Sequence, residues 1–497
     1  MLRKIRITLA AVCFILITLL FLDFTVALHA VVGWLAKIQF LPAVLALHVG
    51  IVAGLIVLTL VFGRIYCSVI CPLGVFQDII SGINGRRKKK KYRFSYSPAL
   101  SWLRYLVLLF FAITLVAGIG SVAALLAPYS SYGRIAQNLL APFWQWGNNL
   151  FAYFAERVDS YAFYETEVWI RSLPTFLVAC ITFVVLFVLA WRNGRTYCNT
   201  ICPVGTVLGF LARYSLFRPV LDPEKCKKCG LCSRSCKAAC IDSQNYHIDY
   251  SRCVVCMNCT EVCNQGAIRY GLRLKKERTP ESRKSEKTDG SRRVFLTGMG
   301  LWAASAVARA QEKKVDGGLA LILDKKIPER TTPIVPPGSL GLRHMTQHCT
   351  ACQLCVSVCP NGVLRPSARL SAFMQPEVSY ERGYCRPECT KCSEVCPAGA
   401  ISKITPADKS AIQVGHAVWI RENCIPVKEG VKCNNCARHC PAEAIQMVLS
   451  DPSRPESPRI PVVNVERCIG CGACENLCPS RPFSAMYVEG HEVHRTI

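Results

Sequence analysis

The sequence is poor in charge, in acidic residues and in the signatures of several redox and enzyme classes. Only 19% of its 497 residues are charged, and 33 acidic residues stand against 59 basic ones. It has no C-x2-C-H pattern, so no c-type haem attachment is expected, and it shows no nucleotide-binding fingerprint or catalytic triad. Instead, 51% of the residues are hydrophobic and 31 are cysteines. This composition excludes a disordered chain and a small disulfide-stapled secreted module.

Four apolar runs are long enough to cross a hydrocarbon core of roughly 30 Å, which takes about 20 helical residues. They are residues 7–24, 41–63, 105–127 and 173–191. Lys and Arg are concentrated before the first run, after the second and after the fourth, so both ends of this part should face the cytoplasm. We expect an α-helical membrane bundle of four spans in the bacterial inner membrane. The basic run at 86–93 anchors that topology, and no nucleic-acid partner is expected.

One motif occurs twice in this part of the chain. Gly-Arg-Ile-Tyr-Cys-Ser-Val-Ile-Cys-Pro-Leu-Gly at 63–74 returns at 194–205 as Gly-Arg-Thr-Tyr-Cys-Asn-Thr-Ile-Cys-Pro-Val-Gly. Each copy follows an even-numbered span, which predicts a two-fold internal repeat with halves 1–93 and 94–221. The thiols of the two C-x3-C-P loops either ligate an additional metal centre or only cap helices and pack against the next domain. These thiols are Cys67, Cys71, Cys198 and Cys202.

Eight cysteines in residues 222–272 have the spacing of a bacterial two-cluster ferredoxin. Both groups have the pattern C-x2-C-x2-C-x3-C, and in such proteins the fourth cysteine of each group serves the other cluster. We expect two 4Fe–4S centres in an α+β module in the cytoplasm, rather than zinc sites. Lys237 and Asn264 replace the usual proline after the fourth cysteine, and Cys240 is spare. The expected ligand sets are Cys226, Cys229, Cys232 and Cys263, and Cys253, Cys256, Cys259 and Cys236.

A polar linker and an export signal are expected next. Residues 273–290 are rich in charge and lack periodicity, which indicates a linker. Residues 291–310 begin with Ser-Arg-Arg-Val-Phe-Leu, continue as a mildly apolar stretch and end with Ala-Arg-Ala. This segment resembles a twin-arginine signal, which exports proteins that fold around cofactors. Residues 311–497 should therefore be periplasmic; a fifth span or an interfacial helix is the alternative.

Sixteen more cysteines in residues 311–497 form four groups, each ending in C-x2-C-x3-C-P. The repeated ending predicts four further 4Fe–4S centres in a second α+β ferredoxin module. A disulfide scaffold is the alternative for an exported domain. The fourth cysteines can pair between adjacent groups or in a nested order. The groups are Cys349, Cys352, Cys355 and Cys359; Cys385, Cys389, Cys392 and Cys396; Cys424, Cys433, Cys436 and Cys440; and Cys468, Cys471, Cys474 and Cys478.

Three ionisable residues are candidates for a quinone site. Asp23, His29 and His48 are all expected towards the outer half of the bundle. Titratable groups at that depth commonly have a function, which here would be hydrogen bonding to a quinone and release of protons. Ordinary packing, or ligation of one haem b by the two histidines, are the alternatives.

The order of these motifs resembles two known proteins joined end to end. Residues 1–272 resemble the NapH-type membrane ferredoxin of quinol dehydrogenases, and residues 291–497 resemble the NapG/MauM-type periplasmic four-cluster ferredoxin. The resemblance implies that the chain oxidises quinol from the membrane pool. Electrons would pass along the clusters to a periplasmic reductase or cytochrome, with a nitrate reductase as the family precedent. The other functions to consider are a maturation or metal-reducing factor, and an adapter that takes electrons from a cytoplasmic donor.

Overall fold

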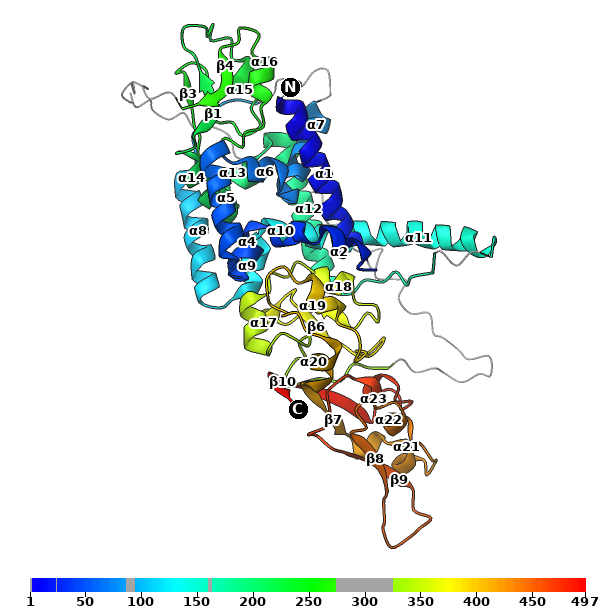
Figure 1. Ribbon diagram of the computed structural model, residues 1–497. Helices are drawn as coiled ribbons and strands as arrows, with labels where there is room; N and C mark the ends of the chain where they lie inside the picture. The colour runs from blue at the N-terminus through cyan, green and yellow to red at the C-terminus, as the bar shows by residue number, and fades with distance from the viewer. Residues whose placement is uncertain (1, 24, 86–93, 160–162, 274–324) are drawn as a thin grey trace, which may run out of the picture.

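The structure is a computed structural model that describes residues 2–23, 25–85, 94–159, 163–273 and 325–497. Figure 1 shows a helical part in the middle of the molecule and one cysteine-rich module at each of its ends. The first cysteine-rich module (217–273) lies near the N-terminus, and the second (325–497) lies at the opposite end. The expected linker and signal, apart from residue 273, and the basic run at 86–93 lie outside the described residues.

The helical part is built from apolar helices, as the sequence predicts. Two of them, α1 and α12, have 21 residues each and are long and apolar enough to cross a membrane. A π-helical turn, Ala136–Leu140, joins α10 to α11. The helices are α1 (Leu2–Leu22), α2 (Ala27–Val32), α3 (Trp34–Lys37), α4 (Phe40–Leu45), α5 (Val49–Phe62), α6 (Ile65–Val69), α7 (Pro72–Gly85), α8 (Ser101–Val116), α9 (Gly120–Leu126), α10 (Pro128–Ile135), α11 (Ala141–Glu156), α12 (Leu173–Asn193), α13 (Thr196–Thr200) and α14 (Pro203–Ala212).

The second and third of the four expected spans are each divided into two helices. The run at 41–63 is divided between α4 and α5 by Leu47, which has a φ of 53°. The run at 105–127 is divided between α8 and α9 by Gly118, which has a φ of 75°. A residue in the left-handed region ends a right-handed helix, whatever the hydropathy of its neighbours. Among the described residues, two helices rather than four therefore reach spanning length.

The predicted internal repeat is present in the helical part. Gly63 and Gly194, with φ of 73° and 70°, end α5 and α12 and turn the chain into α6 and α13. Pro72 and Pro203 then begin α7 and α14, since proline suits the first turn of a helix. The two halves exchange partners: α7 packs on α12, and α14 packs on α5. Within the halves, α1 contacts α6 and α7, and α8 contacts α13 and α14 correspondingly.

The two cysteine-rich modules consist of short helices and two-stranded antiparallel sheets. In the first module β1 pairs with β4 and β2 with β3; in the second β5 pairs with β6, β8 with β9 and β7 with β10. None of the 31 cysteines forms a disulfide. The first module has β1 (Phe217–Leu221), α15 (Leu231–Ser235), β2 (Ile241–Asp242), β3 (His247–Ile248), α16 (Asn258–Val262) and β4 (Ile268–Leu272). The second has α17 (Leu342–His348), α18 (Leu354–Ser357), β5 (Leu364–Pro366), a 3-10 turn (Leu370–Ala372), β6 (Pro376–Val378), α19 (Lys391–Val395), α20 (Pro406–Ala411), β7 (Ile412–Trp419), a 3-10 turn (Arg421–Asn423), α21 (Ile425–Lys428), α22 (Asn435–Arg438), β8 (Ile445–Leu449), β9 (Arg459–Val463), α23 (Ala473–Asn476) and β10 (Met486–Thr496).

Candidate metal centres

The eight motif cysteines of the first module gather in two sets. Burial raises the pKa of the Cys232 thiol to about 11, and three neighbouring thiols contribute to the shift. Burial likewise raises the pKa of Cys259, again with neighbouring thiols contributing. The neighbours of Cys232 are Cys226, Cys229 and Cys263, and those of Cys259 include Cys253, Cys256 and Cys236. In both sets the fourth cysteine comes from the other motif.

Cys240, which is spare in the sequence pattern, lies against the second of these sets. Its Sγ is 3.5 Å from the Sγ of Cys236, and its side chain is 1% exposed. The thiol also contacts Cys253. Cys240 therefore adds a fifth, buried thiol beside the set of Cys253, Cys256, Cys259 and Cys236. The spacing of the motif cysteines does not indicate this contact.

The sixteen cysteines of the second module gather in four sets. Three sets each line a small cavity, and the fourth surrounds Cys392, whose pKa is raised by burial and by three nearby thiols. Each set combines the first three cysteines of one motif with the last cysteine of its neighbour, which is the adjacent rather than the nested order. The sets are Cys349, Cys352, Cys355 and Cys396; Cys359, Cys385, Cys389 and Cys392; Cys424, Cys433, Cys436 and Cys478; and Cys440, Cys468, Cys471 and Cys474.

The four thiols of the C-x3-C-P loops meet inside the helical part. Each is at most 5% exposed, and burial together with the other thiols of the set raises the pKa of Cys71 and of Cys202. Cys202 is the N-cap of α14, where its Sγ accepts a hydrogen bond from the backbone N–H of Gly205 at 3.3 Å. A helix N-terminus favours the thiolate form of a cysteine. The repeat therefore brings four buried sulfurs, two from each half, to one place.

Two arginines of the repeat cross-connect these loops. Arg64 lies 3.8 Å from the Sγ of Cys67 and donates to the carbonyl oxygen of Cys198 at 3.2 Å. Arg195 lies 3.8 Å from the Sγ of Cys198 and donates to the carbonyl oxygen of Cys67 at 2.7 Å. Gln77 adds a contact of 3.3 Å from its Nε2 to the Sγ of Cys198. Each loop is thus held by its own arginine and by that of the other loop.

The charge of these arginines is only partly compensated by carboxylates. Arg195 forms an ion pair with Asp78 at 2.9 Å. Arg64 is fully buried, and among the described residues its partners are neutral oxygens and the Cys67 thiol. An unpaired buried charge costs several kcal/mol. The site therefore suits an anionic group bound by the four thiols, and a 4Fe–4S core with four thiolates carries about −2.

The C-x3-C-P thiols lie between the two cysteine-rich modules. On one side, Arg64 donates to the carbonyl oxygen of Ser251 at 3.1 Å, two residues before Cys253 of the first module. On the other side lies α10, whose Arg134 is fully buried. Ser131 of α10 is hydrogen-bonded to Tyr197, and a Cβ built on Gly133 of α10 would meet the carbonyl oxygen of Cys352 of the second module at 2.5 Å. Since Tyr197 precedes Cys198, α10 links the C-x3-C-P loops to the second module.

No group of three or more His, Cys, Asp or Glu side chains among the described residues is arranged to hold a single metal ion. A cubane is larger than an ion, and its four ligands stand at separate corners. Thiols spread around a small cavity meet that requirement.

The three quinone-site candidates do not form one group. Asp23 and His29 are neighbours, with Oδ2 and Nδ1 3.5 Å apart, but His48 is exposed and begins α5. The carboxylate of Asp23 accepts backbone N–H groups of Thr25 at 2.8 Å and Leu28 at 2.9 Å. Asp23 therefore accepts hydrogen bonds from backbone N–H groups at and just before the start of α2, as a helix-capping residue does.

Comparison with known proteins supports the iron–sulfur interpretation of the chain. A family model described as a 4Fe-4S binding domain matches residues 45–91 and 175–222, the two segments that contain the C-x3-C-P loops. A model described as a 4Fe-4S dicluster domain matches residues 348–400 and 431–481 in the second module. The match to residues 348–400 contains the first two cysteine motifs of the second module, whose cysteines the structure brings together.

The chain is 32% identical to the methylamine utilization ferredoxin-type protein MauM of Paracoccus denitrificans over 189 residues, which cover 81% of that protein and 35% of this chain. This chain belongs to the ferredoxin-type iron–sulfur proteins. It is also 29% identical over 181 residues to the ferredoxin-type protein NapF of Escherichia coli (99% of NapF, 36% of this chain). Over 152 residues this ferredoxin-type protein is 32% identical to NapG of Escherichia coli (64% of NapG, 29% of this chain). No solved structure matches it.

Proposed function

We propose that the protein holds six 4Fe–4S clusters, two in the first module and four in the second. The ligands are the six sets of four cysteines described above. The support is that every set collects four thiols of which the last comes from a different motif, as two-cluster ferredoxins require. The clusters would supply one-electron transfer when bound, and the chain holds the six sets of ligands apart from one another.

The C-x3-C-P thiols hold a further iron–sulfur centre in this proposal. Its support is the convergence of four buried thiols, the buried charge of Arg64, and the match of both loops to a 4Fe-4S binding domain. Six cubanes and one more four-iron centre amount to about 28 irons per chain.

The function that the geometry supports best is electron transfer from the first module to the second through this centre. The observation that carries it is the position of the C-x3-C-P thiols, with Arg64 contacting the first module and α10 bridging to the second. The helical part lies in the bacterial inner membrane in this proposal, with α1 and α12 as full spans. The helices of the broken runs, α4–α5 and α8–α9, complete the crossing, which is tolerated where the break is covered by protein. The two modules then face the cytoplasm and the periplasm.

Membrane quinol is the electron donor and a periplasmic reductase or cytochrome the acceptor. The test is anaerobic mixing of the purified full-length protein with menaquinol, followed by electron paramagnetic resonance. We expect reduction of clusters in both modules. If dithionite reduces them and menaquinol does not, the protein is an adapter with a different donor. An iron content near zero contradicts the whole proposal.

A further inference from the structure

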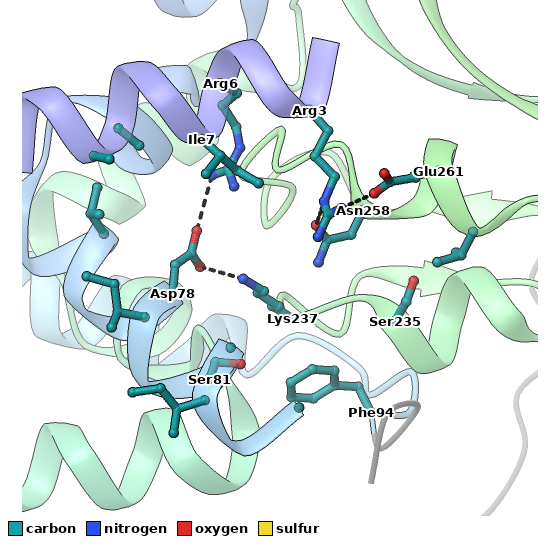
Figure 2. Close-up of a pocket in the computed structure, with 18 of the residues that line it drawn as sticks. Arg3, Arg6, Ile7, Asp78, Ser81, Phe94, Ser235, Lys237, Asn258 and Glu261 are labelled. Atoms are coloured by element: carbon teal, nitrogen blue, oxygen red, sulfur yellow. Dashed lines mark hydrogen bonds and ion pairs between the residues drawn. The ribbon is translucent and has the colours of Figure 1, made fainter. Parts of the chain in front are cut away.

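A large cavity lies between the N-terminal half of α1, α7 and the first cysteine-rich module. Its volume is about 930 Å³, within the size range of small-molecule sites. Figure 2 shows α1 along one side of the cavity, α7 along another, and loops of the first module opposite them. The cavity is not lined by Asp23, His29 or His48.

α1 and α7 contribute isoleucines to the walls of the cavity as well as the charged Arg6 and Asp78. Ile7, Ile79 and Ile83 line it and are 42%, 43% and 53% exposed. These side chains give the cavity an exposed apolar wall that a lipophilic ligand can contact. A hydrophobic tail can therefore leave the cavity along α7.

The inner end of the cavity carries a cluster of charges. Asp78 is paired with Arg6 at 3.2 Å, with Arg195 at 2.9 Å and with Lys237 at 3.5 Å, and two of these pairs are drawn in Figure 2. Burial alone would raise the pKa of Asp78, but Arg195 and Lys237 outweigh it and hold the pKa well below its usual range. Arg6 is 8% exposed, and its Nε has no hydrogen-bond partner. A ligand oxygen placed here would meet both a buried acceptor and a buried donor.

The wall that belongs to the first module consists of residues beside cluster ligands. Lys237 and Asn264 directly follow Cys236 and Cys263, and both line the cavity. In the second module all four motifs have proline at this position. The chain thus departs from its own pattern at the two places where a polar side chain can reach the cavity.

We propose that this cavity binds the head group of a membrane quinol, with its tail lying along α7. The inference rests on the proposed function and assigns the place where quinol, the electron donor, binds. One quinol becomes quinone by losing two electrons and two protons. The two clusters that the cysteines of the first module would hold would supply a one-electron acceptor for each of the two electrons, and the two protons would pass to water at the open rim. A lipophilic ligand whose polar ring must approach a cluster fits these walls, because one side of the cavity is apolar and the other adjoins cluster ligands.

Two variants of the full-length protein in detergent test the site. Gly82 lines the cavity, and a Cβ added there meets nothing within 4 Å, so Gly82→Phe is chosen to place a phenyl ring in the cavity. Gly54 on α5 is an exposed glycine with equally open surroundings and does not line the cavity, which makes Gly54→Phe the matched control. The probe is a photoreactive azidoquinone, with decylubiquinone as competitor and labelled peptides identified by mass spectrometry.

We expect labelling of α7 or of the 231–264 segment in the unaltered protein and in Gly54→Phe. In Gly82→Phe we expect labelling at least tenfold weaker and reduction by menaquinol at least tenfold slower, with complete reduction by dithionite. Labelling near Asp23 and His29 would overturn the cavity as the site while leaving quinol oxidation in place. A phospholipid recovered from the cavity that decylubiquinone cannot displace would also overturn it. Absence of both labelling and menaquinol reduction would instead contradict the proposed function.

Discussion

Gly74 shows how closely single residues are constrained around the C-x3-C-P loops. A Cβ at this position would lie 2.2 Å from the carbonyl oxygen of Cys67 and 2.7 Å from Nη1 of Arg195. Its counterpart Gly205 would meet the carbonyl oxygen of Cys198 at 2.3 Å and Nη2 of Arg64 at 2.9 Å. The glycine that closes each copy of the sequence motif is therefore required by the backbone of its own loop and by the arginine of the other copy.

The substitution Gly74→Ala tests this contact. We expect it to lower the free energy of unfolding by about 1–3 kcal/mol, as overpacking does, and to reduce the iron bound at the C-x3-C-P loops. Gly82→Ala in the same helix is the control, since its Cβ has open space and alanine favours helix by about 0.5–1 kcal/mol. Thermal unfolding and iron analysis give the two readouts. Equal behaviour of both variants would contradict the assigned contact.

Lys409 tests the influence of buried charge on one cluster site. Its ammonium group is buried, donates to the carbonyl oxygens of Arg386 and Cys389, and opposes the burial-driven rise in the pKa of Cys385. A positive charge favours the reduced, more negative form of a cluster. Lys409→Met should therefore lower the midpoint potential of that cluster by on the order of tens of mV. Lys403→Met, at an exposed position, should leave it unchanged in a potentiometric titration followed by electron paramagnetic resonance.

At the scale of elements, local spacing and long-range contact contribute differently to the sites. Four of the six motifs have the C-x2-C-x2-C pattern, which places three thiols in one loop, and the motifs that begin at Cys385 and Cys424 reach the same number of thiols with a longer opening. The fourth ligand depends on which motif packs alongside. In the second module the sequence allows adjacent or nested pairing of the motifs. The contacts of α18 with α19 and of α22 with α23, together with the pairing of β7 with β10, bring adjacent motifs together.

The paired variant Cys67→Ser with Cys198→Ser removes one thiol from each C-x3-C-P loop. We expect a loss of about four irons per chain, with the six ferredoxin clusters retained. Electrons from menaquinol should then reduce only the first module. The paired variant Cys13→Ser with Cys180→Ser is the control, because these half-buried cysteines of α1 and α12 belong to none of the sets. An unchanged iron content in the first variant would show that the loops hold no centre.

Helix breaks were the least predictable elements. Apolar composition marks 41–63 and 105–127 as continuous runs, yet both are divided by a left-handed residue. Both breaks lie against the second module: a Cβ on Gly120 would meet the carbonyl oxygen of Thr346 at 2.2 Å, and Ala46 lies 3.6 Å from a Cβ built on Gly399. Hydropathy indicates that a segment is removed from water, but it does not indicate whether lipid or protein covers the segment. The sequence therefore could not show that these two segments pack against the second module.

At the scale of the whole molecule, the second module is held by direct contacts with the helical part as well as by the chain between them. Asn138 donates to Gln353 at 3.1 Å, Arg382 pairs with Glu167 at 2.8 Å, and Arg171 donates to the carbonyl oxygen of Val356. We expect the two parts to stay together when a protease site inserted near residue 290 is cut.

Co-elution of the two fragments in size-exclusion chromatography checks that expectation. Asn138→Ala combined with Trp169→Ala should weaken the association, because Trp169 lies under the guanidinium groups of Arg365 and Arg382 at 4.6 and 4.4 Å. An exposed tryptophan variant on the far helix surface, Trp102→Ala, is the control. Separate elution of the unaltered fragments after cleavage would contradict the interface.

The sequence by itself determined the number of cysteine motifs and the repetition of the C-x3-C-P motif, because each depends on spacing within a short segment. Tertiary structure alone decided three further features. It joined the four C-x3-C-P thiols across two halves, paired the motifs of the second module in adjacent order, and placed the buried Arg64 and Arg134 between the modules. These features depend on contacts between residues more than 100 positions apart, such as Arg64 with Cys198, and such contacts form only when the helices pack.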